Sequence, residues 1–65
     1  MPLHPTEESL PESRRKEIFQ ALVETQDRNV GVPQSRRLVA RQFGVSENQI
    51  RDIEQEGLDE QWPPL

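Results

Sequence analysis

Five polar residues in one short run carry hydrogen-bonding groups of complementary kinds: Ser46, Glu47, Asn48, Gln49 and Arg51. Asparagine and glutamine can each pair with adenine through two hydrogen bonds, arginine pairs in the same way with guanine, and glutamate accepts from cytosine. The run follows a predicted turn, so these groups would stand at the start of a helix, where base edges are read in the major groove. They are therefore our candidate base-reading residues.

The same run also has a simpler interpretation. Ser46 followed three residues later by Gln49 is a capping-box pattern, in which two side chains bind free backbone amides at the start of a helix. Gln49 is the residue that such a cap would withdraw from base reading. In this alternative the polar groups cap and solvate the helix, as they would in any small helical bundle.

Three arginines that precede the turn are candidate phosphate-contacting residues: Arg36, Arg37 and Arg41. The formal net charge of −4 opposes binding to nucleic acid, because phosphate neutralisation dominates that affinity. However, all eight Lys and Arg residues lie within residues 13–51, whereas residues 52–65 contain five acids and no base. A basic centre between acidic ends could face DNA, and it could equally be ordinary surface charge.

The sequence contains few residues that could support disulfides, metal binding or catalysis. The chain has no cysteine and one histidine, His4, which leaves neither a disulfide framework nor a metal-ligand set. It contains no Ser/His/Asp set, no phosphate-cradling glycine loop and no apolar run of the roughly 18 to 20 residues that span a bilayer. We therefore expect a cytoplasmic protein that is not an enzyme, uses no cofactor, metal or small-molecule substrate, and does not enter a membrane.

The corner that positions the polar run is predicted by Ala40 and Gly44. A small residue four places before a glycine lets two helices approach closely, and the glycine permits the left-handed backbone of a three- to four-residue turn. With 65 residues and 31% hydrophobic content, the chain has room for one domain of three short helices. We therefore expect an all-α fold, a three-helix domain that contains a helix-turn-helix.

Hydrophobic periodicity places the helices at about 12–27, 33–43 and 46–57, with Gly57 as the end of the third. We expect residues 1–10 to form a flexible arm, part of which can join the first helix so that Leu10 packs inward, residues 11–57 the domain and residues 58–65 an extended tail. The apolar residues predicted to face the core are Ile18, Phe19, Ala21, Leu22, Val23, Leu38, Val39, Phe43, Val45, Ile50, Ile53 and Leu58.

The tail ends in Trp62-Pro63-Pro64-Leu65 and permits two interpretations. Trp62 can fold back over the first and third helices, where burial of the indole would contribute roughly 2 to 3 kcal/mol to a small core. Alternatively, Trp62 and Leu65 form an exposed anchor that fills a groove on a partner protein. We favour the folded-back arrangement.

Residues 43–58, FGVSENQIRDIEQEGL, resemble the C-terminal helix-turn-helix of housekeeping bacterial sigma factors, which recognises the −35 promoter element. The residues that carry the resemblance are Phe43-Gly44-Val45-Ser46 in the turn, then Ile50-Arg51, Ile53-Glu54 and Gly57-Leu58. The resemblance implies a homeodomain-like or sigma-region-4-like fold, in which Glu47, Asn48 and Arg51 read bases. It also implies promoter-type DNA binding or contact with the transcription machinery.

Two hypotheses about function follow from these patterns. The first is a small transcriptional regulator that binds double-stranded DNA. One such domain reads only about three to five base pairs, so a homodimer or a larger complex would be needed for useful specificity. The second is a protein-interaction module on the same scaffold, which binds a partner through its acidic ends and the Trp62 tail. The basic centre favours the first hypothesis, and the net charge favours the second.

Overall fold

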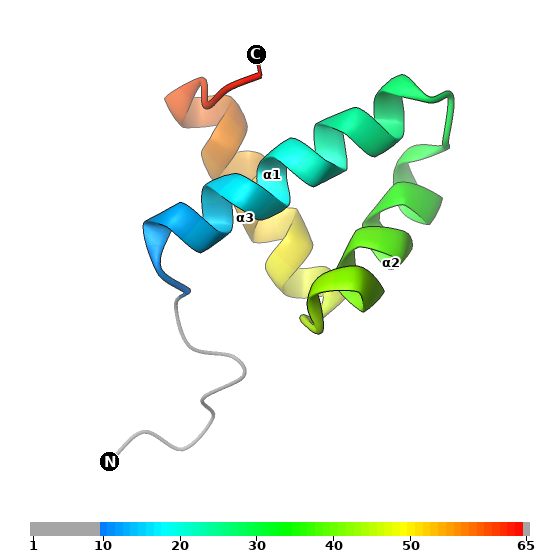
Figure 1. Ribbon diagram of the computed structural model, residues 1–65, viewed down its shortest axis with the longest axis horizontal. Helices are drawn as coiled ribbons and strands as arrows, with labels where there is room; N and C mark the ends of the chain where they lie inside the picture. The colour runs from blue at the N-terminus through cyan, green and yellow to red at the C-terminus, as the bar shows by residue number, and fades with distance from the viewer. Residues whose placement is uncertain (1–9, 65) are drawn as a thin grey trace.

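The computed structural model describes residues 10–64, and every regular element in that range is an α-helix (Figure 1). The helices are α1 (Glu12–Asp27), α2 (Val32–Phe43) and α3 (Glu47–Glu60). Each helix contacts the other two, and α3 crosses behind α1 in Figure 1 while α2 lies to one side. The chain is thus a compact three-helix bundle, which confirms the all-α prediction.

One small core joins the three helices. Its buried side chains come from each helix and from the segment that follows α3: Ile18, Phe19, Leu22, Val39, Ala40, Ile50, Ile53 and Trp62. Leu10, Phe43 and Val45 pack against this cluster from its edge and are half-buried. A core of this size leaves a domain of 65 residues little surplus stability, so each contact in it counts.

A buried hydroxyl ties α1 to α2 beneath the apolar cluster. Ser35 has 0% exposure, and its hydroxyl donates to the carbonyl of Val32 at 2.7 Å. The same oxygen accepts from Gln26 Nε2 at 3.1 Å, and that amide also lies 3.5 Å from a carboxylate oxygen of Glu54 on α3. A buried polar group is tolerated when it is hydrogen-bonded in this way, so Ser35 contributes to how the helices are placed.

Two leucines predicted to face the core do not. Leu38 is 45% exposed and Leu58 is 50% exposed. Successive helical residues are about 100° apart around the axis, so Leu38 points away when its neighbour Val39 points inward. The same reasoning applies to Leu58, whose neighbour Gly57 occupies the buried side of α3. The apolar type of these residues was therefore a poor guide to their direction.

The prediction that Gly57 ends the third helix is wrong. α3 continues to Glu60, and its left-handed C-cap residue is Gln61, at φ 55°. Gly57 is instead the site where α3 passes closest to the ring of Phe19, since a Cβ built there would stand 2.3 Å from Phe19 Cδ1. Glycine is needed here for close approach of helix and ring, although the same residue type is also a common helix stop.

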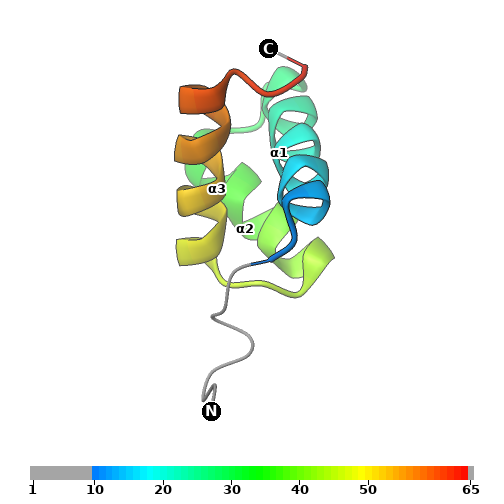
Figure 2. The same ribbon diagram turned by 90° about the vertical axis from the view of Figure 1, so that its left-hand side faces the viewer.

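The predicted extended tail is not seen either. After α3, the backbone amide of Trp62 donates to the carbonyl of Gly57 at 2.9 Å, which turns the chain back toward α1. Figure 2 shows this C-terminal segment reaching from the end of α3 across to α1. Trp62 is 6% exposed and meets Phe19 edge to face at 6.0 Å between ring centroids. The folded-back position of Trp62 is therefore confirmed.

The remaining predictions about the chain ends lie outside the described residues. They concern the flexible arm up to residue 9, His4, and Leu65 as part of an anchor. Leu10, which was assigned to the arm, belongs to the folded part, since its side chain packs on the core and its carbonyl accepts a hydrogen bond from Arg15. The folded domain thus extends at least from residue 10 to residue 64.

Candidate functional site

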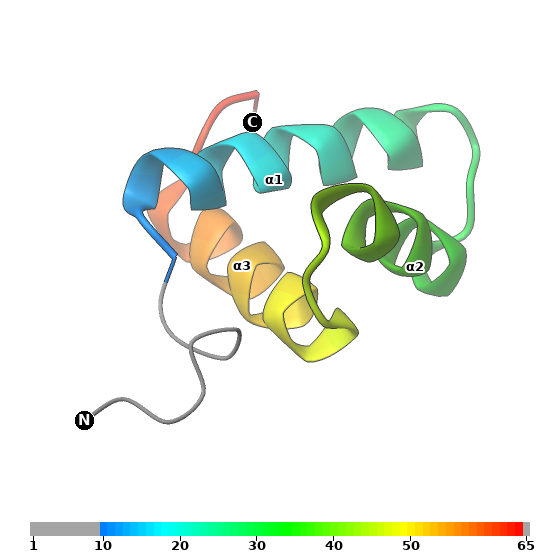
Figure 3. The ribbon, with the colours of Figure 1, turned by 60° about the horizontal axis from the view of Figure 1, so that its bottom comes forward.

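The corner between α2 and α3 is built as the spacing predicts. Gly44 adopts the left-handed conformation, with φ 68° and ψ 35°, and its amide donates to the carbonyl of Ala40. The amide of Val45 donates to the same carbonyl at 3.0 Å, and Ala40 is 6% exposed where the helices meet. Figure 3 shows the resulting short connection from α2 into α3. This corner fixes where the first turn of α3 stands relative to α2.

The first turn of α3 is closed by a capping box. Ser46 Oγ accepts from the amide of Gln49 at 3.0 Å, and Gln49 Oε1 accepts from the amide of Ser46 at 3.0 Å. Both side chains are half-buried. Of the five residues proposed to read bases, these two are therefore already committed to the cap, as the simpler interpretation predicted.

The other three candidates for base reading are free to contact a ligand. Glu47, Asn48 and Arg51 are all exposed on the first turns of α3. None of them makes a side-chain hydrogen bond or an ion pair within residues 10–64. Together they offer a carboxylate acceptor, an amide that both donates and accepts, and a forked guanidinium donor, which can address three different base edges.

Arg36 differs from the other two arginines predicted to contact phosphate. Its guanidinium is 2.8 Å from the Glu54 carboxylate through Nη2 and 3.0 Å through Nε. Both side chains are partly buried, with 29% exposure for Arg36 and 18% for Glu54. Its position therefore makes Arg36 a cross-link between α2 and α3, and whether it also contacts phosphate stays a prediction.

Three more bases form ion pairs around α1. Arg15 holds Glu56 of α3 through two hydrogen bonds of 2.8 and 3.0 Å, and this hydrogen-bonded carboxylate raises the pKa of the Arg15 guanidinium. Lys16 lies 3.1 Å from Glu12. Arg14 lies 3.0 Å from Glu17 and stands over the ring of Phe43, 4.9 Å from its centroid. The N-terminal part of α1 therefore offers little positive charge to a ligand.

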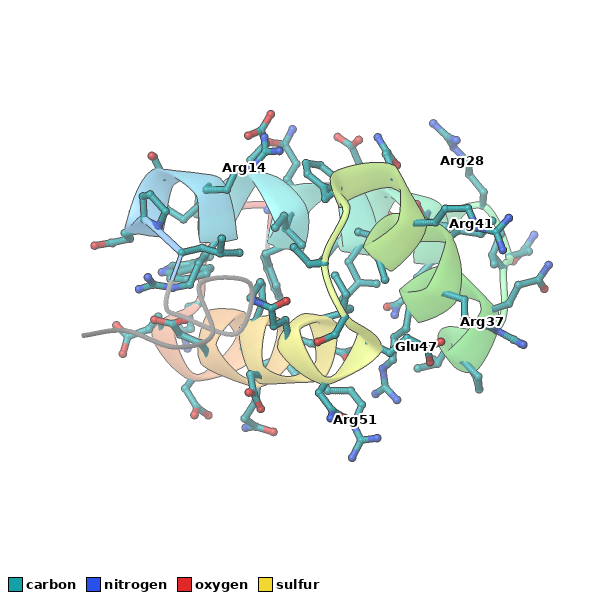
Figure 4. All side chains as sticks on the ribbon, turned by 90° about the horizontal axis from the view of Figure 1, so that it is seen from below. Arg14, Arg28, Arg37, Arg41, Glu47 and Arg51 are labelled. Atoms are coloured by element: carbon teal, nitrogen blue, oxygen red, sulfur yellow. The ribbon has the colours of Figure 1, made fainter. Side chains whose placement is uncertain are left out.

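Four arginines remain without an ion pair in the described part of the chain: Arg28, Arg37, Arg41 and Arg51. All four are exposed. Figure 4 shows Arg28, Arg37 and Arg41 projecting from the α2 end of the bundle, with Glu47 and Arg51 at the adjoining start of α3 and Arg14 well apart. We call these four residues the free arginines. No carboxylate within residues 10–64 holds any of them in an ion pair, although the exposed acids Asp27 and Asp52 are their neighbours in the chain and Glu47 lies among them.

Arg28 was missed by the sequence reasoning. It follows the last residue of α1, where its backbone amide donates to carbonyls of that helix, and Figure 4 shows its side chain at the same end of the bundle as Arg37 and Arg41. Nothing in its local sequence distinguishes it from Arg14, because both have an acid within helical reach. The fold decides which arginine is paired, and sequence spacing alone does not contain that information.

The competing site at the C-terminus loses its main side chain. Trp62 packs against Phe19, with the ammonium of Lys16 5.8 Å from the centroid of its indole. An indole that is 6% exposed belongs to the core of this molecule and is not available to fill a groove elsewhere. What the C-terminal end presents to a partner is acidic side chains and the exposed Leu58.

Two other properties bear on the class of protein. Within residues 10–64, no three His, Cys, Asp or Glu side chains gather in a way that could hold a metal ion. None of the helices described has the length and apolar character needed to cross a membrane. Comparison with models of protein families, with curated proteins and with solved structures finds no match to this chain. The side chains of the site are therefore the basis for a proposed function.

Proposed function

We propose that this chain is a small sequence-specific DNA-binding domain, and that it acts in transcriptional regulation. The first turns of α3 enter the major groove, where Glu47, Asn48 and Arg51 meet base edges. Arg37 and Arg41 on α2 contact the phosphate backbone beside the groove. Ser46 and Gln49 hold the start of α3 in shape and read no base.

The free arginines are the observation that carries this proposal. Four of the eight basic side chains form ion pairs within residues 10–64, and the other four extend from the end of α1 along α2 to the first turns of α3. Phosphate contacts fix the register of a protein on the duplex, and side chains in the groove then specify the sequence. Here both kinds of group lie together on two helices whose relative position is set by Gly44 and Ala40.

The negative net charge limits the affinity but does not remove the proposed surface. Two of the five acids in residues 52–65, Glu54 and Glu56, are neutralised by Arg36 and Arg15 within the fold. Asp59 and Glu60, at the other end of α3, repel phosphate and so favour an orientation with the α2 end toward DNA, whereas Asp52 lies beside Arg51 and lowers the affinity. We therefore propose modest affinity with a steep dependence on salt.

The resemblance to the −35-reading domain of sigma factors enters here as a proposal. We propose that the two share a way of docking, with promoter-type DNA as the ligand and a cytoplasmic site of action. The proposal assigns no catalytic role to any residue, so the proposed activity is binding. The protein-interaction alternative keeps the acidic end of the molecule but loses Trp62 as its anchor.

The test is fluorescence anisotropy of a labelled mixed-sequence duplex at about 50 and about 200 mM salt. Release of counterions from the two phosphates that Arg37 and Arg41 contact gives a slope of about −1.8, so the affinity should fall about tenfold between the two conditions. Arg41→Ala should reduce the slope by about one unit. Arg14→Ala is the matched control, since that arginine is already paired with Glu17. Equal affinity at both salt concentrations would contradict the proposal.

A further inference from the structure

Two leucines stand outside the core in surroundings of opposite charge. Leu38 lies on the outer face of α2, and Leu58 lies near the end of α3. A single exposed leucine needs no explanation on a protein surface. The charges around these two, however, are complementary.

The surface around Leu38 is basic and hollowed. Gln34, Arg37, Leu38 and Arg41 line an open hollow of about 290 Å³ on α2. Both arginines belong to the free arginines, and the leucine side chain between them is 45% exposed. Phosphate contacts would use the two guanidinium groups but would leave this apolar side chain without a role.

The surface around Leu58 is acidic. Asp59 and Glu60 follow it in the last turn of α3, and both are exposed and make no ion pair within residues 10–64. The Asp59 carboxylate is held by the Gln55 amide at 3.1 Å, which keeps it beside Leu58 on the helix surface. The side chains here thus present one apolar group next to negative charge.

The two surfaces lie at opposite ends of the bundle. Figures 1 and 3 both show α2 at one end and the last turns of α3 at the other. A single molecule therefore cannot bring its own Leu58 to its own Leu38, but two copies can do so without turning either one around. A contact of this kind uses different patches on the two molecules, so it can repeat along a row of copies.

We propose that this chain self-associates head to tail, with Leu58 of one copy seated in the α2 hollow of the next. Leu58 then packs against Leu38, and Asp59 pairs with Arg37 and Arg41. The contact involves one helical face on each side, well below the roughly 1,200 Å² of total buried surface at which specific interfaces become stable, so the association is weak. DNA phosphates compete with it, because both use the same two arginines.

The association is measured on the whole chain without DNA, by translational diffusion in NMR and by sedimentation between about 0.05 and 2 mM protein at about 50 mM salt. The average mass should rise with concentration, and added salt should reverse the rise. Leu38→Ser and Leu58→Ser should each weaken the association at least about fivefold, since each removes one half of the apolar contact. Both positions are exposed, so these variants should melt like the parent chain.

Charge reversal separates this contact from nonspecific attraction. Arg41→Glu and Asp59→Arg should each reduce the association, because each places like charges together. The chain that carries both substitutions should associate again, since its α2 hollow is then more acidic and its α3 end is more basic. Arg28→Glu is the matched control: it changes charge by the same amount outside the hollow and should have little effect.

A mass that stays monomeric up to about 2 mM would overturn the proposal, as would a double variant that fails to recover association. Leucine variants that associate like the parent would overturn it too. The outcome is independent of the proposed function, because no DNA is present. If the chain binds DNA but does not self-associate, only the head-to-tail proposal is rejected. If it self-associates but does not bind DNA, only the DNA-binding proposal is rejected.

Discussion

The two halves of α3 differ in what their side chains contact. In residues 47–51, Glu47, Asn48 and Arg51 are exposed, and only Ile50 and the cap residue Gln49 turn toward the domain. In residues 52–60, Glu54 and Glu56 reach back to α2 and α1, and Gly57 lies against Phe19. One helix thus supplies a candidate binding surface at its start and much of the assembly of the bundle toward its end.

This contrast suggests a way in which so small a chain could support the proposed binding surface. Cross-links and close packing in the second half of α3 fix the helix, so its first half can leave polar groups exposed without losing position. If the contrast is correct, substitutions at Glu54, Glu56 and Gly57 should change stability, and substitutions at Glu47, Asn48 and Arg51 should change ligand binding without changing stability.

Trp62→Ala should have the largest effect. It removes a buried indole and its edge-to-face contact with Phe19, and such truncations cost about 3 to 5 kcal/mol in folding free energy. Thermal and urea unfolding should show a domain that is unfolded or close to it at room temperature. Trp62→Phe keeps an aromatic ring at the site and should lose much less. A Trp62→Ala domain that melts at the parent temperature would remove the C-terminal segment from the account of stability.

Gly57→Ala should destabilise the domain by about 1 to 3 kcal/mol, even though alanine is the better helix former. The added methyl group would collide with the Phe19 ring, which is itself buried and cannot easily move. Gly31→Ala is the matched control, since a Cβ there meets nothing within 4 Å. Its unfolding free energy should stay within about 1 kcal/mol of the parent. Equal melting of the two variants would mean that α3 and Phe19 do not approach as closely as described.

Arg51→Ala and Asn48→Ala should relax sequence preference in DNA binding and leave stability alone. A paired base contact is worth about 1 to 3 kcal/mol of discrimination, so selection from a random duplex library should show a lost preference at one position for each variant. Arg37→Ala, by contrast, should weaken binding to all sequences alike. Unchanged selected sequences in both α3 variants would mean that the first half of α3 does not read bases.

Arg36→Ala should produce the smallest effect, a loss of about 1 kcal/mol in unfolding free energy. Its guanidinium is bound to Glu54, so its removal opens the contact between α2 and α3. Arg36→Ala should change the salt dependence of DNA binding less than Arg41→Ala does. The reason is that Arg41 makes no ion pair within the described residues, whereas Arg36 is bound to Glu54. A larger change in salt slope for Arg36→Ala would assign Arg36 to the phosphate-contacting set after all.

Local patterns predicted the parts of the fold that depend on neighbouring residues. The Ala40–Gly44 spacing predicted the corner, Ser46 and Gln49 predicted the capping box, and the bounds of α1 were as expected. Each of these features involves groups within four residues of one another. Their physical causes are therefore present in the local sequence.

Features that depend on distant residues were predicted poorly. Gly57 was taken as a helix end because its partner Phe19 lies 38 positions earlier in the chain. Arg36 was taken as a free base because Glu54 comes to it only when α3 folds back beside α2. Arg28 was overlooked for the converse reason, since the fold gives it no acid to pair with among the described residues. The fold thus withdrew Ser46 and Gln49 from the base-reading set through a local cap, and it paired Arg36 with an acid 18 positions away.

The most direct test of the central claim is an amide-shift titration of the isotope-labelled chain with a mixed-sequence DNA duplex at about 50 mM and then about 200 mM salt. We expect shifts in residues 28–51, centred on Arg37, Arg41 and the first turns of α3, that fade at the higher salt concentration. Residues 52–64 should stay largely unchanged. An absence of shifts at either salt concentration, or shifts confined to residues 52–64, would contradict the assignment of α2 and the start of α3 as the DNA-binding surface.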